Sequence, residues 1–98
     1  YFGLAQGDSL MGAGIFNGDL LIVSRALKPK QGDIIVANLN GEFVCKIFNI
    51  AQRTLEVTAA NTKPHRIAED DVFEIEGVVI RSVRLHKPLK ETFSVRPG

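Results

Sequence analysis

The chain has 98 residues, of which 45% are hydrophobic, and a formal net charge of +1. This length makes one small domain, and the composition excludes intrinsic disorder. The near-neutral charge argues against a strongly basic nucleic-acid surface, so we expect any DNA contact to be indirect or weak. No apolar run approaches the roughly 20 residues of a membrane span and no signal peptide is visible, which favours a cytoplasmic protein without membrane contact.

Short apolar runs separated by turn signals predict strands along most of the chain. Before the first strand, residues 9–14 are expected to form one short helical turn with Asp8 or Ser9 as its N-cap. No long window carries a helical period, so we predict a mostly β fold, a small antiparallel or mixed sheet that folds on itself. The expected strands are Leu20–Val23, Ile34–Leu39, Phe43–Phe48, Leu55–Ala59 and Val78–Val83.

Two aspartates and the C-terminal segment complete the expected organisation. Asp19 and Asp33 each follow a glycine and precede an expected strand, so we interpret them as turn residues. Residues 1–85 are the predicted core. Residues 86–98 hold Pro88, Pro97 and a surplus of basic side chains, which predicts a basic tail with little packing of its own. A solvated tail is the simpler interpretation, and a patch for a partner or for phosphates is the alternative.

Cys45 is the single cysteine, so the fold does not depend on an internal disulfide. We interpret it as a small buried hydrophobic residue, with a nucleophile paired to His65 or His86 as the alternative. One cysteine and two separated histidines give no recognisable metal-site spacing. No phosphate-binding glycine loop is present either, so we expect no metal and no cofactor.

Ser9 and Lys46 are the residues that point to chemistry. Ser9 ends the turn sequence Gly7-Asp8-Ser9, and Lys46 lies in an expected strand. A serine hydroxyl is a poor nucleophile until a base removes its proton, and a lysine amine can do so when burial lowers its pKa. The period of a strand places Lys46 on one face with Val44 and Phe48, which suits a half-sheltered amine and equally an exposed one. An ordinary turn serine is the alternative for Ser9.

The order of these motifs resembles the LexA/UmuD/phage-repressor family of self-cleaving Ser-Lys peptidases. The resemblance covers roughly residues 1–84 and implies that Ser9 is the nucleophile and Lys46 the general base. Leu10 departs from it, because relatives usually have Met there, and Gly12-Ala13 replaces a more polar turn. The residues that carry it are the stretch from Tyr1-Phe2 through Gly7-Asp8-Ser9, Gly14-Ile15, Gly18–Val23, Gly32-Asp33-Ile34, Gly41-Glu42-Phe43 with Lys46, and Phe73–Ile80.

The resemblance also implies partners. It implies a homodimer, a UmuC-like Y-family DNA polymerase that uses the processed dimer as an accessory subunit in error-prone translesion synthesis, and RecA filaments on single-stranded DNA that stimulate precursor cleavage in the SOS response. Two alternatives stay open. One is the dimerisation and self-cleavage half of a LexA-like or phage-type repressor, and the other is a signal-peptidase-like enzyme that acts in trans.

Relatives cut a small-residue–glycine bond well upstream of the serine. Ala13-Gly14 follows Ser9 too closely to return to it in an extended form, so we interpret it as a turn. Since the chain begins at Tyr1 without Met, we expect a processed product or a trimmed form of a longer protein.

The letters Gly7-Asp8-Ser9-Leu10 also open the GDSL lipases and esterases. Those enzymes need a downstream Asp-x-x-His, whereas Thr62 and Val83 occupy the Asp position before His65 and His86. They also use a larger α/β fold, so we set this alternative aside.

Overall fold

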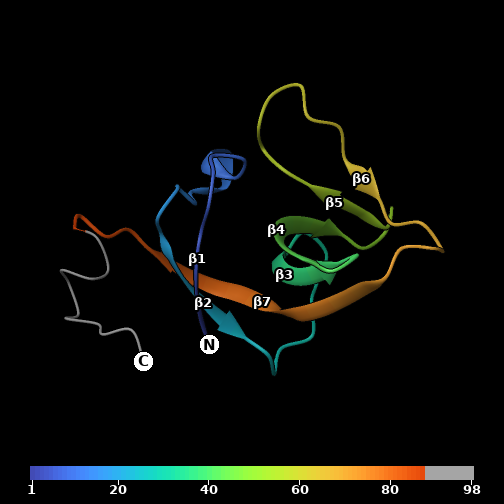
Figure 1. The fold of residues 1–98 in the computed structure, drawn as a ribbon, viewed down its shortest axis with the longest axis horizontal. Coiled ribbons are helices and arrows are strands. Elements are labelled where there is room, and N and C mark those ends of the chain that lie inside the picture. The colour runs from blue at the N-terminus through green and yellow to red at the C-terminus, as the bar shows by residue number, and fades with distance from the viewer. Residues whose placement is uncertain (88–98) are drawn as a thin grey trace.

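The computed structural model describes residues 1–87, which form one antiparallel sheet of seven strands and a single 3-10 turn (Figure 1). The strands are ordered β1-β2-β7-β3-β4-β5-β6, and every pairing among them is antiparallel. The predicted mostly β fold is therefore confirmed, with antiparallel rather than mixed pairing. The elements are β1 (Phe2–Leu4), η1 (Met11–Ala13), β2 (Leu20–Ser24), β3 (Ile34–Leu39), β4 (Glu42–Asn49), β5 (Thr54–Glu56), β6 (His65–Arg66) and β7 (Phe73–Val83).

Most expected strands are found, and β3 has the predicted bounds. The strand expected over Leu55–Ala59 is wrong in length, because β5 ends at Glu56. Two residues later the backbone N–H groups of Thr58 and Ala59 donate to the Ser9 carbonyl instead of to a neighbouring strand. The predicted core boundary at residue 85 remains a prediction, and all but His86 and Lys87 of the expected tail lies outside the described residues.

The core consists of two apolar clusters, and β3 and β4 contribute to both. Val44 and Phe48 of β4 pack with the first cluster, and Cys45 and Ile47 pack with the second. The alternation expected for β4 is thus confirmed. The first cluster is Ile35, Ala37, Phe48, Leu55, Ile67 and Val78, and the second is Ala5, Leu10, Ile15, Leu21 and Val23.

The Gly-Asp sequences at Asp19 and Asp33 form the same turn. The Asp19 carboxylate accepts a hydrogen bond from the Phe16 N–H at 2.8 Å, and Asp33 does the same for the Lys30 N–H at 2.8 Å. In both turns the glycine before the aspartate has a positive φ, +89° and +83°, which favours glycine. The interpretation of Asp19 and Asp33 as turn residues that open strands is confirmed.

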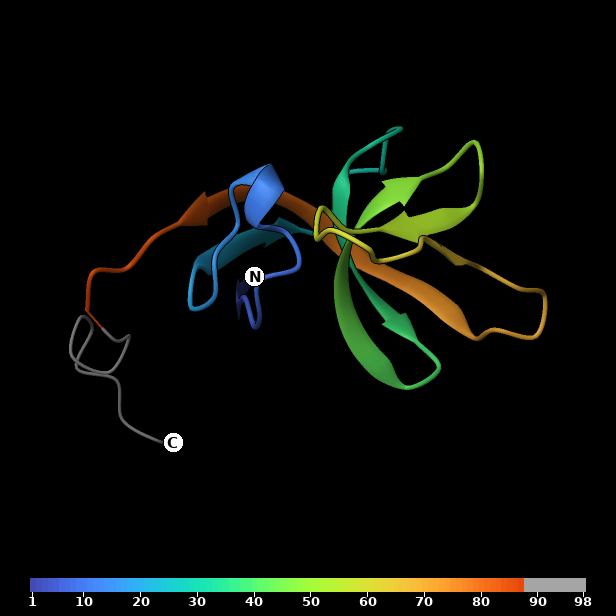
Figure 2. The same ribbon diagram turned by 90° about the horizontal axis from the view of Figure 1, so that it is seen from above.

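Strand β7 joins two groups of strands that otherwise do not pair. It pairs with β2 on one side and β3 on the other, with a register shift in each pairing. In Figure 2 it runs between the blue strands β1 and β2 and the green and yellow strands. Gly77 of β7 lies tightly against β2, because an added Cβ would lie 2.6 Å from Val23 Cγ1 and 2.7 Å from the Ser24 carbonyl oxygen.

We predict that Gly77→Ala destabilises the domain by about 1–3 kcal/mol, because the Ser24 backbone must move to admit a methyl group. Gly3→Ala is the matched control, since an added Cβ at Gly3 in β1 meets nothing within 4 Å. Urea unfolding of the two variants measures the difference. Equal free energies of unfolding for both variants would contradict the packing constraint at Gly77.

Candidate active site

The turn that carries Ser9 is held by hydrogen bonds to the loop before β2. The Ala5 N–H donates to the Asp19 carbonyl at 2.9 Å, and the Gly18 N–H donates to the Ala5 carbonyl at 2.8 Å. The Gly7 N–H donates to Asn17 Oδ1 at 2.8 Å. These bonds fix the backbone on the N-terminal side of Ser9.

Asp19 is also the anchor of an ion pair, a role the sequence analysis missed. Its side chain is almost fully buried, and Arg84 Nε lies 3.6 Å from Asp19 Oδ1. The Arg84 guanidinium also stacks on the Phe16 ring, 3.8 Å from its centroid. The residue just after β7 thereby clamps the loop that supports the Ser9 turn. A glycine-aspartate pair in the sequence predicts a turn, but it gives no indication that the aspartate will pair with Arg84.

The N-cap expected for the helical turn is wrong. The N-cap of η1 is Leu10, and no side chain caps it. A backbone carbonyl accepts the hydrogen bond instead, since the Met11 N–H donates to the Asp8 carbonyl at 3.3 Å. Within residues 1–87 the Ser9 hydroxyl forms no hydrogen bond. It therefore does not cap the helical turn.

Lys46 lies in β4, where it is half-buried and pairs with Ile35 of β3. The other edge of β4 is paired to β5 only from Ile47 onward, so the edge at Lys46 has no strand neighbour in the described part of the chain. Neither ion pair found among residues 1–87 involves Lys46.

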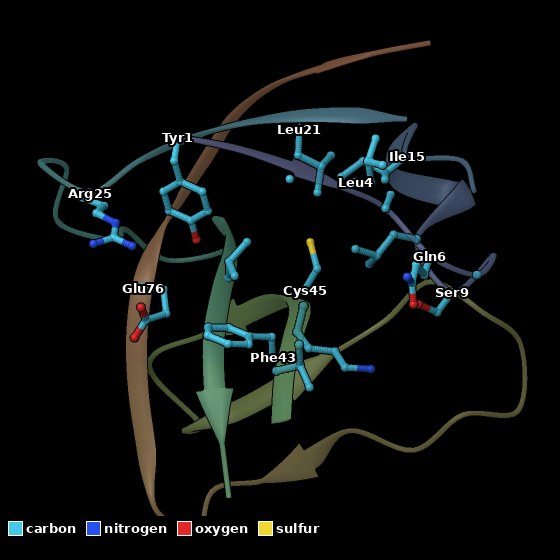
Figure 3. Close-up of a pocket in the computed structure, with 17 residues that line it drawn as sticks. Tyr1, Leu4, Gln6, Ser9, Ile15, Leu21, Arg25, Phe43, Cys45 and Glu76 are labelled. Atoms are coloured by element: carbon cyan, nitrogen blue, oxygen red, sulfur yellow. The ribbon is translucent and has the colours of Figure 1, made fainter. Parts of the chain in front are cut away.

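Ser9 and Lys46 line the same cleft, which has a volume of about 640 Å³. One wall is the segment Gly3–Gly7 and another is Phe43–Lys46 of β4. Figure 3 shows Ser9 and Gln6 at one end, and Tyr1, Arg25 and Glu76 together at the other, with apolar side chains between. Ser9 and Lys46 are not hydrogen-bonded to each other in this structure. Such bonds often form only when substrate is bound.

Cys45 also faces this cleft, with its sulfur toward the middle (Figure 3). Burial raises the pKa of its thiol from 9.0 to about 11, against a smaller opposing effect of the Lys46 charge. The thiol is therefore protonated at neutral pH. Neither His65 nor His86 lines the cleft, and His65 instead lies 3.1 Å from Asp71 Oδ2. The interpretation of Cys45 as a small apolar residue fits this environment, whereas a Cys-His pair does not.

Residues 1–87 contain no group of three or more His, Cys, Asp or Glu side chains arranged to hold a metal ion. None of the helices formed by these residues has the length and apolar character needed to cross a membrane.

The described residues thus form a curled antiparallel sheet in which Ser9 and Lys46 line one cleft. Residues 1–80 match the family model described as Peptidase S24-like, and the chain belongs to this family.

Three relatives illustrate the range of the family. Protein ImpA of Salmonella typhimurium is 34% identical over 90 residues, which is 92% of this chain and 62% of ImpA. Protein SamA of Salmonella typhimurium is 43% identical over 79 residues, 81% of this chain and 55% of SamA. The LexA repressor of Oleidesulfovibrio alaskensis is 38% identical over 82 residues, 82% of this chain and 40% of the repressor. The chain thus spans between 40% and 62% of the length of these relatives.

We predict that Cys45 reacts with an alkylating reagent about 100-fold more slowly than a free thiol near neutral pH. Its pKa is raised from 9.0 to about 11, and each pKa unit lowers the thiolate fraction tenfold. The alkylation rate, followed by mass spectrometry, should keep rising up to about pH 11. In urea, where the chain is unfolded, the rate should equal that of a free thiol. Equal rates in the folded and unfolded protein would contradict the burial of this thiol.

Proposed function

We propose that this chain is the catalytic core of a self-cleaving serine peptidase, with Ser9 as nucleophile and Lys46 as general base. The observation that carries the proposal is that both residues line one cleft. They come from two groups of strands that pair with each other only through β7, so their convergence depends on the whole fold.

The chemistry follows from the two groups. The neutral amine of Lys46 takes the proton of Ser9 Oγ as the oxygen attacks the scissile carbonyl carbon, and it then returns a proton to the leaving amine. Water hydrolyses the resulting acyl-enzyme by the same route. The Ser9 and Leu10 N–H groups donate to no acceptor within residues 1–87, which leaves them available to stabilise the oxyanion.

The substrate in this proposal is a segment of the same protein upstream of residue 1. The local Ala13-Gly14 bond is a poor candidate, because the Ala13 N–H donates to the Leu10 carbonyl and the Gly14 N–H to the Met11 carbonyl, each at 2.9 Å. These bonds hold that peptide inside η1. The apolar middle of the cleft suits the side chains of an extended peptide.

For the cellular role we propose a UmuD-like protein. Its processed homodimer serves as an accessory subunit of a UmuC-like Y-family polymerase in translesion synthesis, and RecA filaments on single-stranded DNA stimulate the cleavage. The support is the family membership together with the motif order from Gly7 to Ile80.

The similarity to a LexA repressor over 82% of this chain favours a second candidate, the self-cleavage half of a transcriptional repressor. The residues upstream of this domain in the full-length protein discriminate the two. A short arm supports the polymerase role, and a helical DNA-binding domain supports the repressor.

We predict that Ser9→Ala, Lys46→Ala and Lys46→Arg each abolish self-cleavage of the full-length protein while its melting temperature changes little. Lys46→Arg keeps the charge and much of the length, but a guanidinium stays protonated and cannot act as a base. Lys28→Ala is the control and should cleave normally, because Lys28 is an exposed lysine that does not line the cleft. A gel-based time course measures the rates, and cleavage by Lys46→Arg at the wild-type rate would exclude the lysine base.

We predict that self-cleavage of the wild-type protein accelerates from about pH 6 to pH 10, because the reaction needs a neutral lysine amine. The rate should be measured at constant ionic strength, with circular dichroism to confirm that the protein stays folded at each pH. A flat rate profile over this range would contradict the proposed base.

A further inference from the structure

The loop after β5 holds the carbonyl group of Ser9 through hydrogen bonds. The backbone N–H groups of Thr58 and Ala59 donate to the Ser9 carbonyl oxygen at 2.9 and 3.1 Å. The Thr58 hydroxyl donates to the same oxygen at 3.2 Å. Three donors on one carbonyl oxygen leave the Ser9 peptide little freedom to rotate.

The Thr58 hydroxyl makes a second hydrogen bond within the same turn. Thr58 Oγ1 accepts from the Gly12 N–H at 2.9 Å, so one hydroxyl connects the backbone at Ser9 with the backbone at Gly12. The fit is close, because a Cβ on residue 12 would lie 2.7 Å from Thr58 Cβ and 2.9 Å from its Oγ1. The glycine at position 12 is thus matched to the threonine at position 58.

This contact also connects the two parts of the candidate site. Thr58 follows β5, and β5 pairs with β4 through Ile47, the residue after Lys46. Ser9 belongs to the turn after β1, at the other end of the strand order. The Thr58 contact therefore sets the position of the Ser9 backbone relative to the strand that carries Lys46.

We propose that Thr58 is a positioning residue for self-cleavage, whose hydroxyl holds the turn from Ser9 to Gly12 so that the Ser9 oxygen meets the Lys46 amine. The proposal rests on the proposed function of Ser9 and Lys46. Thr58 acts through the backbone of Ser9 and not on the reacting atoms. The Ser9 hydroxyl has no hydrogen bond of its own within residues 1–87, so its location depends on that backbone.

The test compares Thr58→Val, which keeps the shape and loses the hydroxyl, with Thr58→Ser, which keeps the hydroxyl. Thr62→Val is the matched control, because Thr62 is in the same loop and its hydroxyl makes only a long contact of 3.5 Å to the Ala60 carbonyl. Self-cleavage of the full-length proteins is measured from about pH 6 to pH 10, together with urea unfolding.

We expect Thr58→Val to lower the cleavage rate about tenfold or more at every pH, without changing the shape of the profile, because the base is untouched. Thr58→Ser and Thr62→Val should stay within about threefold of the wild type. A wild-type rate for folded Thr58→Val overturns the proposal. Equal losses in Thr58→Val and Thr58→Ser also overturn it, as does a loss explained by the unfolded fraction alone.

A second measurement is independent of cleavage. In the Ser9→Ala background, amide hydrogen exchange at Gly12 should be faster with Thr58→Val than with Thr62→Val, because the Gly12 N–H has lost its acceptor. Unchanged exchange of the Gly12 amide would show that the Thr58 hydroxyl does not hold the turn, and it would overturn the positioning role. If Ser9→Ala alone still cleaves, the proposed function fails and the positioning role falls with it. Faster exchange of the Gly12 amide in that case would mean that the Thr58 hydrogen bonds stabilise the turn without serving cleavage.

Discussion

The whole arrangement depends on the close contact between β7 and β2 at Gly77. A side chain there would collide with Val23 and with the backbone of Ser24, so the two groups of strands could not come as near to each other. Protein interiors are packed so tightly that even one added methyl group lowers stability. Ser9 lies beyond β1 in one group and Lys46 lies in β4 of the other. A small change in the crossing at Gly77 therefore moves the two halves of the cleft relative to each other.

The turn that carries Ser9 shows how a small domain can fix a backbone while leaving a side-chain hydroxyl without a hydrogen bond. Asp19 accepts hydrogen bonds through its carboxylate and its backbone carbonyl, and Arg84 holds it from the end of β7. Thr58 donates a hydrogen bond to the Ser9 carbonyl. All these contacts use the backbone or neighbouring side chains, and none uses the Ser9 hydroxyl. Rigidity of the backbone together with an unoccupied side chain is what a pre-organised nucleophile requires.

Much of this sheet could be predicted from sequence, because apolar runs bounded by Gly, Pro and Asn mark strands locally. The bounds of β3 and the alternating faces of β4 were predictable for that reason. The end of β5 was not, since Thr58 and Ala59 have suitable residue types for a strand and are diverted by a carbonyl almost 50 positions away. The N-cap failed likewise, because backbone carbonyls replaced the expected side chain. The sequence pattern of β4 also left the exposure of Lys46 undecided, since its burial depends on segments that are distant in the chain.

The position of β7 in the chain has a consequence for biosynthesis. It is the last strand of the described region, yet it lies in the interior of the sheet between β2 and β3. Domains fold as units while the chain emerges from the ribosome, and pairings between distant segments wait until both segments are available. Until residues 73–83 have emerged, the strands that carry the serine turn and those that carry Lys46 have no strand to join them. Under the proposed function, the chain would have no complete cleft for self-cleavage until residues 73–83 have been synthesised.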